Sequence, residues 1–147
     1  MIKNRNRSRF LPVFICLLVV MLFSSYITMN ANATGNIQDT PFIYQGSSIN
    51  AVTDPRPKWD YTSSYAYNSG SDCDIDKVQV YGCVVIDATV ISAVDCTAGN
   101  PKDLPFGYAK YLPNYVKEYG YGFARLKFTV NSNQPKSLYG LWSPDSV

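Results

Sequence analysis

The residue types that catalysis needs are scarce in this sequence. It contains no histidine, so the Ser-His-Asp and Cys-His arrangements of nucleophilic catalysis are excluded. Beyond residue 33 there is also no Ser-x-x-Lys nucleophile motif. The remaining option is a pair of opposed carboxylates, for which the chain offers ten aspartates and one glutamate. The sequence therefore predicts a protein that is not an enzyme, with no catalytic residue and no cofactor. A carboxylate-dependent hydrolase using Asp87 and Glu118 is a remote alternative.

Three aspartates alternate in a turn-rich segment and invite comparison with a calcium site. Asp72, Asp74 and Asp76 have the spacing that opens a calcium-binding loop. An EF-hand loop also needs glycine at its sixth position and a bidentate glutamate at its twelfth, where this chain has Lys77 and Cys83. We therefore expect a solvated acidic loop and no metal site.

Three cysteines follow the N-terminal segment: Cys73, Cys83 and Cys96. In an oxidising compartment, three cysteines favour one disulfide and one remaining thiol. We slightly favour Cys83–Cys96, because these residues flank a strand-like segment, while Cys73–Cys96 and Cys73–Cys83 stay open as alternatives. The third thiol would be buried or would join two copies in a disulfide-linked dimer. Metal binding by three thiols without histidine is the less favoured interpretation.

The first 33 residues predict export from the cytoplasm. Four basic residues precede an apolar run from Phe10 to Met29, and the run closes on Ala31-Asn32-Ala33. This order is that of a secretory signal peptide, expected to be helical and cleaved after Ala33. A retained membrane anchor is the alternative, since ~20 apolar residues can span a bilayer. Both interpretations place the remaining domain outside the cytoplasm.

Removing the signal peptide reverses the charge of the chain. Residues 34–147 keep nine basic and 11 acidic side chains, which gives a net charge of −2. A nucleic-acid-binding protein needs a basic surface to neutralise phosphates, and none is indicated here. We expect no nucleic acid partner, and contact with a membrane only through an uncleaved signal peptide.

Alternating hydrophobic residues predict an all-β domain. Residues 34–57 are rich in proline and glycine and predict an exposed N-terminal arm, with one short extended piece at Phe42–Tyr44. Residues 58–147 predict a small antiparallel β-sandwich of six to eight strands. Within it, 77–95 alternates strongly, and its length requires a break near Asp87. The expected core consists of Val78, Val80, Val84, Ile86, Val90, Ala124, Leu126, Phe128 and Val130.

Aromatic residues supply the candidate binding surfaces. Between Lys58 and Asn68, one strand face carries Trp59, Tyr61, Ser63, Tyr65 and Tyr67. We expect this face to cover the core, and a binding platform is the alternative. Proline and glycine frame a single helical turn at 113–120, where Tyr111, Tyr115 and Tyr119 would share one side. These three tyrosines and Trp142 form the candidate binding surface, with packing against the sheet as the alternative.

The C-terminal part of the chain resembles a known family. The resemblance rests on residues 111–121, on Ala124-x-Leu126 and above all on the closing Trp142-Ser-Pro-Asp-Ser-Val147. The family consists of small exported proteins of Gram-positive bacteria that carry a domain of unknown function. Some members are similar to companions of secreted bacteriocin systems. The resemblance implies export and a small β-rich domain, and it brings no catalytic residues.

These observations favour a secreted, non-catalytic binding protein. Eleven tyrosines and two tryptophans in residues 34–147 suit recognition, because tyrosine offers contact area at low entropic cost. Its partner would be a component of the cell envelope, such as the cell wall or a carbohydrate, or another protein. The alternative is a bacteriocin-like secreted effector or accessory protein.

Overall fold

The sheet is organised around its longest strand, β8 (Phe123–Ser143), which has 21 residues. A computed structural model describes residues 35–146 of the chain. The signal-peptide helix and the cleavage site predicted within residues 1–33 lie outside this range. Seven further strands precede β8 in the described part: β1 (Thr40–Val52), β2 (Arg56–Pro57), β3 (Ser64–Asn68), β4 (Ile75–Ile86), β5 (Thr89–Asp95), β6 (Lys102–Leu104) and β7 (Ala109–Leu112).

All strand pairs in the described residues are antiparallel, which confirms the all-β prediction. The main strand order is β5-β4-β8-β3-β7; β1 and β2 also pair with β8, and β6 pairs with β4. These hydrogen bonds join all eight strands into one sheet, so the expected sandwich of two separate sheets is not confirmed in that form. No helix in residues 35–146 is long and apolar enough to cross a membrane.

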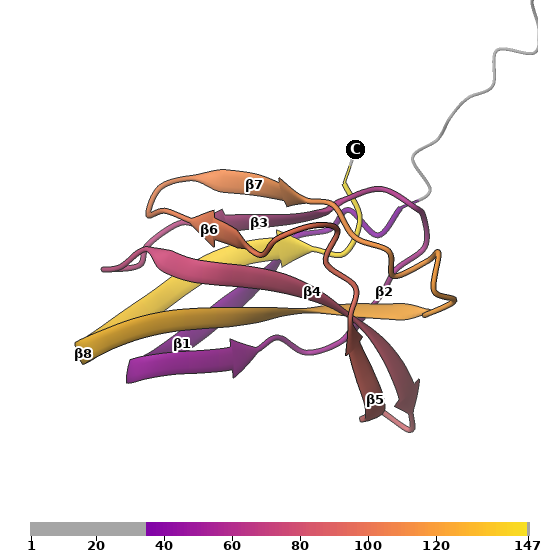
Figure 1. Cartoon of the computed structure of the whole chain (residues 1–147), viewed down its shortest axis with the longest axis horizontal. Coiled ribbons are helices and arrows are strands. Elements are labelled where there is room, and N and C mark those ends of the chain that lie inside the picture. Colours follow the sequence, from indigo (N-terminus) through magenta and orange to yellow (C-terminus); the bar gives the residue numbers. More distant parts are fainter. Residues whose placement is uncertain (1–34, 147) are drawn as a thin grey trace, which may run out of the picture. The chain divides into compact units, whose positions relative to one another are not determined.

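β1 and β8 fold over together, and this brings two parts of the sheet face to face (Figure 1). Their register shifts between the pairs Gly46↔Lys136 and Ser48↔Asn131. These two pairs are five residues apart in β8 but only two residues apart in β1. Before this bend β8 pairs with β4, and after it β8 pairs with β3. The ring of Phe42 lies 4.4 Å from the ring of Phe128, centroid to centroid, although the two residues belong to opposite halves of the folded sheet.

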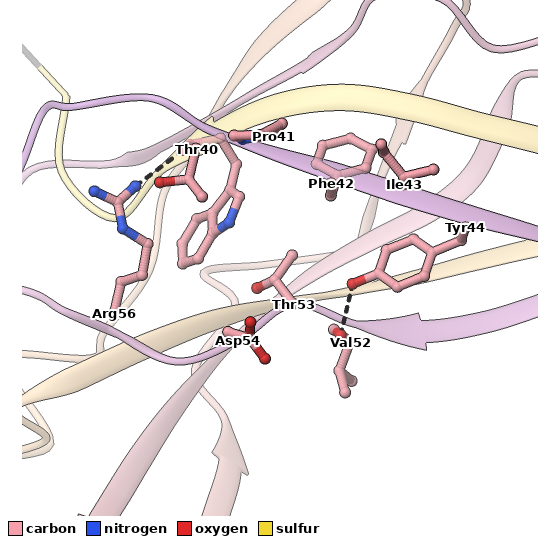
Figure 2. Close-up of a pocket in the computed structure, with 10 residues that line it drawn as sticks. Thr40, Pro41, Phe42, Ile43, Tyr44, Val52, Thr53, Asp54 and Arg56 are labelled. Carbon is pink, nitrogen blue, oxygen red and sulfur yellow. Dashed lines mark hydrogen bonds between the residues drawn. The ribbon is translucent and has the colours of Figure 1, made fainter. Parts of the chain in front are cut away.

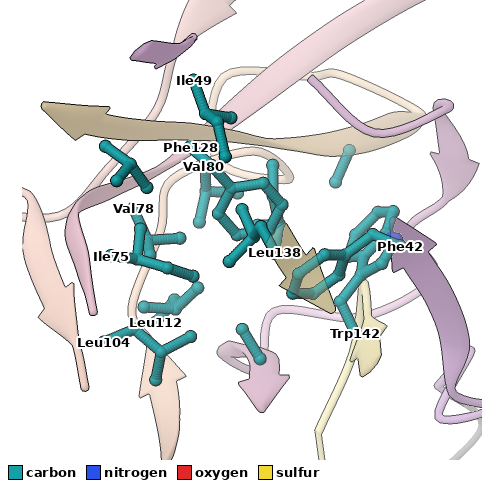
Figure 3. Packing of buried hydrophobic residues seen from close by; sticks show 14 of the residues in the cluster. Phe42, Ile49, Ile75, Val78, Val80, Leu104, Leu112, Phe128, Leu138 and Trp142 are labelled. Atoms are coloured by element: carbon teal, nitrogen blue, oxygen red, sulfur yellow. The ribbon is translucent and has the colours of Figure 1, made fainter. Parts of the chain in front are cut away.

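The core fills the space inside this fold (Figure 3). Ala124, Leu126, Phe128 and Val130 are all buried, because every second residue of a strand points to the same face. Val78 and Val80 of β4 join them, so six of the nine predicted core residues are confirmed. At Gly140 a β-carbon would collide with the Phe42 ring and the Tyr67 carbonyl oxygen, so only glycine fits there.

The other three predicted core residues are not buried. Val84 and Ile86 are 40% and 53% exposed, and Val90 is half-buried. The break at Asp87 is confirmed, since Asp87 and Ala88 form a tight turn with φ of 49° and 63°. The pairing of β4 with β8 stops at Cys83, so beyond that point β4 has only β5 beside it. The alternation continues into a hairpin whose alternating side chains no other strand of residues 35–146 covers.

The segment predicted as an N-terminal arm instead contains β1. Twelve of its 13 residues pair with β8, on both sides of the bend, and Phe42 and Ile49 are buried in the core. The prediction was wrong because it took proline and glycine as evidence against a strand. Pro41 lies at the start of the strand and Gly46 at the bend, where such residues are tolerated.

The aromatic face predicted to cover the core points the other way. Strand β3 begins only at Ser64, and its buried residues are Ser64, Ala66 and Asn68. Ala66 lies opposite Trp142, whose large ring already fills the inner side at this point. Tyr65 therefore faces outward, and Trp59 and Tyr61 are exposed in the preceding loop.

Candidate binding site

A pocket of about 490 Å³ opens between the two halves of β1 (Figure 2). One side comes from the start of β1, and the other from the end of β1 and the residues after it. Trp142 of β8 contributes from below the surface. The lining consists of Thr40, Pro41, Phe42, Ile43, Tyr44, Val52, Thr53, Asp54, Arg56 and Trp142. The volume lies within the range of small-molecule binding pockets, ~300–1,000 Å³.

Three aromatic side chains give the pocket its apolar surface. Phe42 and Trp142 belong to the core and are held rigidly, while Tyr44 is half-buried. The Tyr44 hydroxyl donates a hydrogen bond of 2.6 Å to the carbonyl oxygen of Val52 and so ties the two halves of β1 together. Burial, and secondarily the charge of Asp54, raises the pKa of Tyr44, so its hydroxyl remains a donor.

Arg56 places a positive charge at the same pocket. Its Nη1 donates to the carbonyl oxygens of Gln38 and Trp142, at 2.6 and 3.2 Å, and its guanidinium carbon lies 5.6 Å from the Trp142 ring centroid. Burial lowers the pKa of Arg56, and nearby carboxylates partly oppose that shift. None of the described carboxylates forms a direct ion pair with this side chain. The charge is therefore held in place by neutral acceptors, while Asp54 lines the pocket with the opposite charge.

A buried ion pair anchors the C-terminal end behind this region. Lys58 Nζ lies 2.8 Å from Asp145 Oδ1, and the two side chains are only 1% and 0% exposed. Lys58 also donates to the carbonyl oxygens of Thr62 and Pro144, at 2.6 and 2.8 Å. Every donor of the ammonium group therefore has an acceptor, as a buried cation requires.

The carboxylate of Asp145 is equally well satisfied. Its Oδ2 accepts backbone N–H groups from Asn36, at 2.6 Å, and Trp59, at 3.0 Å. Burial alone would raise the pKa of Asp145, but the hydrogen bonds from Lys58, Trp59 and Asn36 outweigh it and hold the pKa below its ordinary value. The closing motif Trp142-Ser-Pro-Asp-Ser-Val147 therefore has a structural role in its described residues.

The structure divides the predicted tyrosine and tryptophan surface. Tyr111 of β7 packs against Tyr65 of β3, with ring centroids 5.8 Å apart. Tyr115 and Tyr119 form a second exposed pair, at 5.7 Å. Trp142 is buried, contrary to its expected place on a surface, because it occupies a core-facing position of β8. Trp142 still contributes to the lining of the pocket between the halves of β1, but it is not part of an exposed binding surface.

Residues 113–120, predicted to form a helical turn, contain one hydrogen-bonded turn and no helix beyond it. The amide of Tyr119 donates to the carbonyl oxygen of Tyr115 at 2.9 Å, the spacing of one α-helical turn. Gly120 ends it with φ of 81°, a backbone conformation that glycine adopts without strain.

The expected Cys83–Cys96 disulfide is not formed: all three cysteines of the described chain are free thiols. The Cys96 amide donates to the carbonyl oxygen of Val80 at 2.8 Å, and Cys96 packs into the core beside Val80. Cys83 lies three residues further along β4, which places it on the opposite face of the sheet. A disulfide needs β-carbons ~3.8 Å apart, so the two thiols cannot meet across the sheet.

Cys73 is no better placed as a partner. Cys73 precedes β4 and is ten residues from Cys83 along the chain. Because a strand rises ~3.3 Å per residue, this separation is far longer than a disulfide can span. Burial is the largest cause of a raised pKa for each of the three thiols. The structure therefore favours unreactive thiols.

The alternating aspartates bind backbone amides. Asp72 accepts from Ser137 at 2.9 Å, Asp74 from Phe106 at 2.7 Å and Asp76 from Asn131 at 2.7 Å. These carboxylates thus fix the start of β4 and the loop before it to two parts of β8 and to Phe106. Within residues 35–146, no group of three or more potential ligands is arranged to hold a metal ion.

The polar residues that matter most at the pocket and behind it were not identified from the sequence. Tyr44 and Arg56 at the pocket, and Lys58 in the buried ion pair, are single residues whose importance depends on partners elsewhere in the chain, so no local pattern marks them. The short extended piece at Phe42–Tyr44 was the one available signal. Of the two carboxylates considered for catalysis, Asp87 lies in the β4–β5 turn and Glu118 in the turn before Gly120, and neither lines this pocket.

The described residues define a small antiparallel β protein with an open, aromatic-lined pocket and a buried ion pair. The chain belongs to the family described as Protein of unknown function (DUF2712), whose model matches residues 28–146. This confirms the resemblance to a family with a domain of unknown function. No curated protein and no solved structure matches the chain.

Proposed function

We propose that this is a secreted, non-catalytic binding protein whose ligand enters the pocket between the two halves of β1. One observation carries the proposal: a preformed pocket of about 490 Å³ combines rigid aromatic walls with one cation and one anion. Such a combination suits recognition, because apolar surface supplies affinity and a few polar groups fix the orientation. The carboxyl groups with a shifted pKa, Asp103 and Asp145, are both shifted downward, away from what a general acid needs.

The ligand that we propose is a component of the cell envelope. The predicted signal peptide supports this proposal, because it would place the domain outside the cytoplasm. The expected cleavage after Ala33 is tested by the intact mass of secreted protein, which should correspond to a chain that begins at Thr34. A secreted or cell-associated chain that still contains Phe10–Met29 would indicate a membrane anchor instead.

The pocket is tested by retention on purified peptidoglycan and on whole cells. Val52 lies at the pocket and is 41% exposed, so Val52→Arg should block entry without disturbing the core. Val94→Arg is the matched control, because Val94 is 43% exposed on β5 and is not part of the pocket. We expect Val52→Arg to reduce retention and Val94→Arg to keep it at the wild-type level. A wild-type protein that is retained by neither material would contradict the proposal.

The second candidate is a bacteriocin-like secreted effector or accessory protein. One observation favours it: the β4–β5 hairpin exposes four large aliphatic side chains that an envelope could contact, namely Val84, Ile86, Ile91 and Val94. This candidate predicts growth inhibition of related strains and a transporter or immunity gene beside the coding gene. Complete inactivity over a broad panel of strains would argue against it.

A further inference from the structure

The outer face of the sheet carries a row of four side chains that the core does not use. Tyr65 lies directly opposite Tyr111 on one side and Ser143 on the other. The register of β1 with β8 begins at Thr40↔Trp142, so Asp39 continues this row beyond Ser143. Residues directly opposite one another in a sheet share a face. A carboxylate, a hydroxyl and two phenol rings therefore line up across four neighbouring segments.

This row contains a hollow of about 180 Å³. The hollow arises because Ser143, a small residue, lies between the longer side chains of Asp39 and Tyr65. The hydroxyl of Ser143 donates to the carbonyl oxygen of Asp145 at 2.9 Å, so the floor is fixed from below. The rings of Tyr65 and Tyr111 form one wall, with their planes inclined by 56°.

The groups around the hollow are available to a ligand. Tyr111 is 61% exposed, and the side chain of Asp39 is exposed as well. Burial, and then the charge of Asp39, raises the pKa of Tyr65, so its hydroxyl remains protonated. This region is separate from the pocket in Figure 2, since the two share no lining residue.

We propose that Tyr65, Tyr111 and Asp39 form a saccharide-binding site. A sugar ring has an apolar face of C–H groups and an edge of hydroxyl groups. The negative π-face of a tyrosine attracts the C–H groups, and burying them removes apolar surface from water. The Asp39 carboxylate accepts hydrogen bonds from the hydroxyl groups, and charge-assisted bonds are stronger than neutral ones. We expect one pyranose ring to lie in the hollow of about 180 Å³, against the wall of the two tyrosines.

The site is tested by calorimetric titration with three soluble probes: the tetrasaccharides of β-1,4-linked N-acetylglucosamine, β-1,4-linked glucose and α-1,4-linked glucose. The protein is expressed from its full sequence and is used as it is purified, whether or not the host has removed the signal peptide. We expect saturable binding of at least one probe. Tyr111→Ala should weaken it about tenfold, or about 1.4 kcal/mol, which lies near the upper end of what one aromatic contact contributes. Asp39→Asn should weaken it by a similar factor, because a charged acceptor is lost.

Three control variants distinguish this site from the β1 pocket and from the second tyrosine pair. Tyr111→Phe keeps the ring and should bind nearly as wild type does. Tyr119→Ala removes a tyrosine of similar exposure, 59%, from the other ring pair and should have no effect. Val52→Arg blocks only the β1 pocket, so it should leave saccharide binding intact even if the function proposed above fails. Absence of saturable binding to all three probes, or wild-type affinity in Tyr111→Ala, would overturn the proposal.

Discussion

Replacing Asp145 by asparagine tests whether the Lys58–Asp145 pair holds the C-terminal end in place. The substitution keeps the shape of the side chain but leaves the Lys58 ammonium buried without a countercharge. Breaking a buried pair from one side costs about 3–5 kcal/mol of unfolding free energy. For a domain of this size, at roughly 4 °C per kcal/mol, the melting temperature should fall by ~12–20 °C.

Urea unfolding followed by tryptophan fluorescence measures this loss, because the buried Trp142 becomes exposed on unfolding. The matched control is Asp103→Asn. Asp103 and Lys110 are also 2.8 Å apart, but this pair is exposed to solvent, so the urea midpoint should not change. The double variant Lys58→Met/Asp145→Leu should cost clearly less than the sum of its single variants, because it leaves no unpaired charge. A loss below about 1 kcal/mol in Asp145→Asn, or full additivity in the double variant, would refute this reasoning.

The same pair predicts a pH dependence. The folded-state pKa of Asp145 is lower than its unfolded value, so its contribution is complete above ~4, the usual carboxyl pKa, and is lost as the pH falls through the folded value. The stability difference between wild type and Asp145→Asn should therefore be constant near neutral pH and shrink in acid. A difference that grows as the pH falls would contradict the assignment.

Three further predictions follow from the packing. Cys83 and Cys96 should resist alkylation in the native protein and react fully in urea, with no mass change on prior reduction; a mass gain of about 2 Da on reduction would reveal a disulfide. Gly140→Ala should cost at least about 1–3 kcal/mol in urea unfolding, since a β-carbon has no room there; an unchanged midpoint would show that the strands can shift apart. Asp74→Ala should lower the melting temperature by freeing the Phe106 amide, whereas added calcium should leave the wild type unchanged; a calcium-dependent rise would restore the metal interpretation.

The sequence by itself determined the all-β class and much of the core. Alternation with a period of two specifies which residues share a face, and at the start of β8 the face of Ala124, Leu126, Phe128 and Val130 is uniformly apolar, so only one orientation buries it. The same pattern, together with the length limit of strands, located the turn at Asp87. These predictions depend on local spacing alone.

Tertiary structure decided which face of an ambiguous strand is buried. In β3 the alternating tyrosines could pack inward or outward, and the Trp142 ring beside Ala66 settled the choice. Likewise, alternation predicted that Val84 and Ile86 would be buried, but burial requires a second layer, and within the described part of the chain none covers these two side chains.

The candidate sites were the least accessible to sequence reasoning, because their parts are distant in the chain. Lys58 and Asp145 are 87 residues apart, and the row from Asp39 to Tyr111 exists only through the register of three strand pairs. The closing motif was visible in the sequence as a family resemblance, but its buried position and its ion pair were not. A local pattern records what a side chain can do, whereas its partner is set by how the sheet folds over.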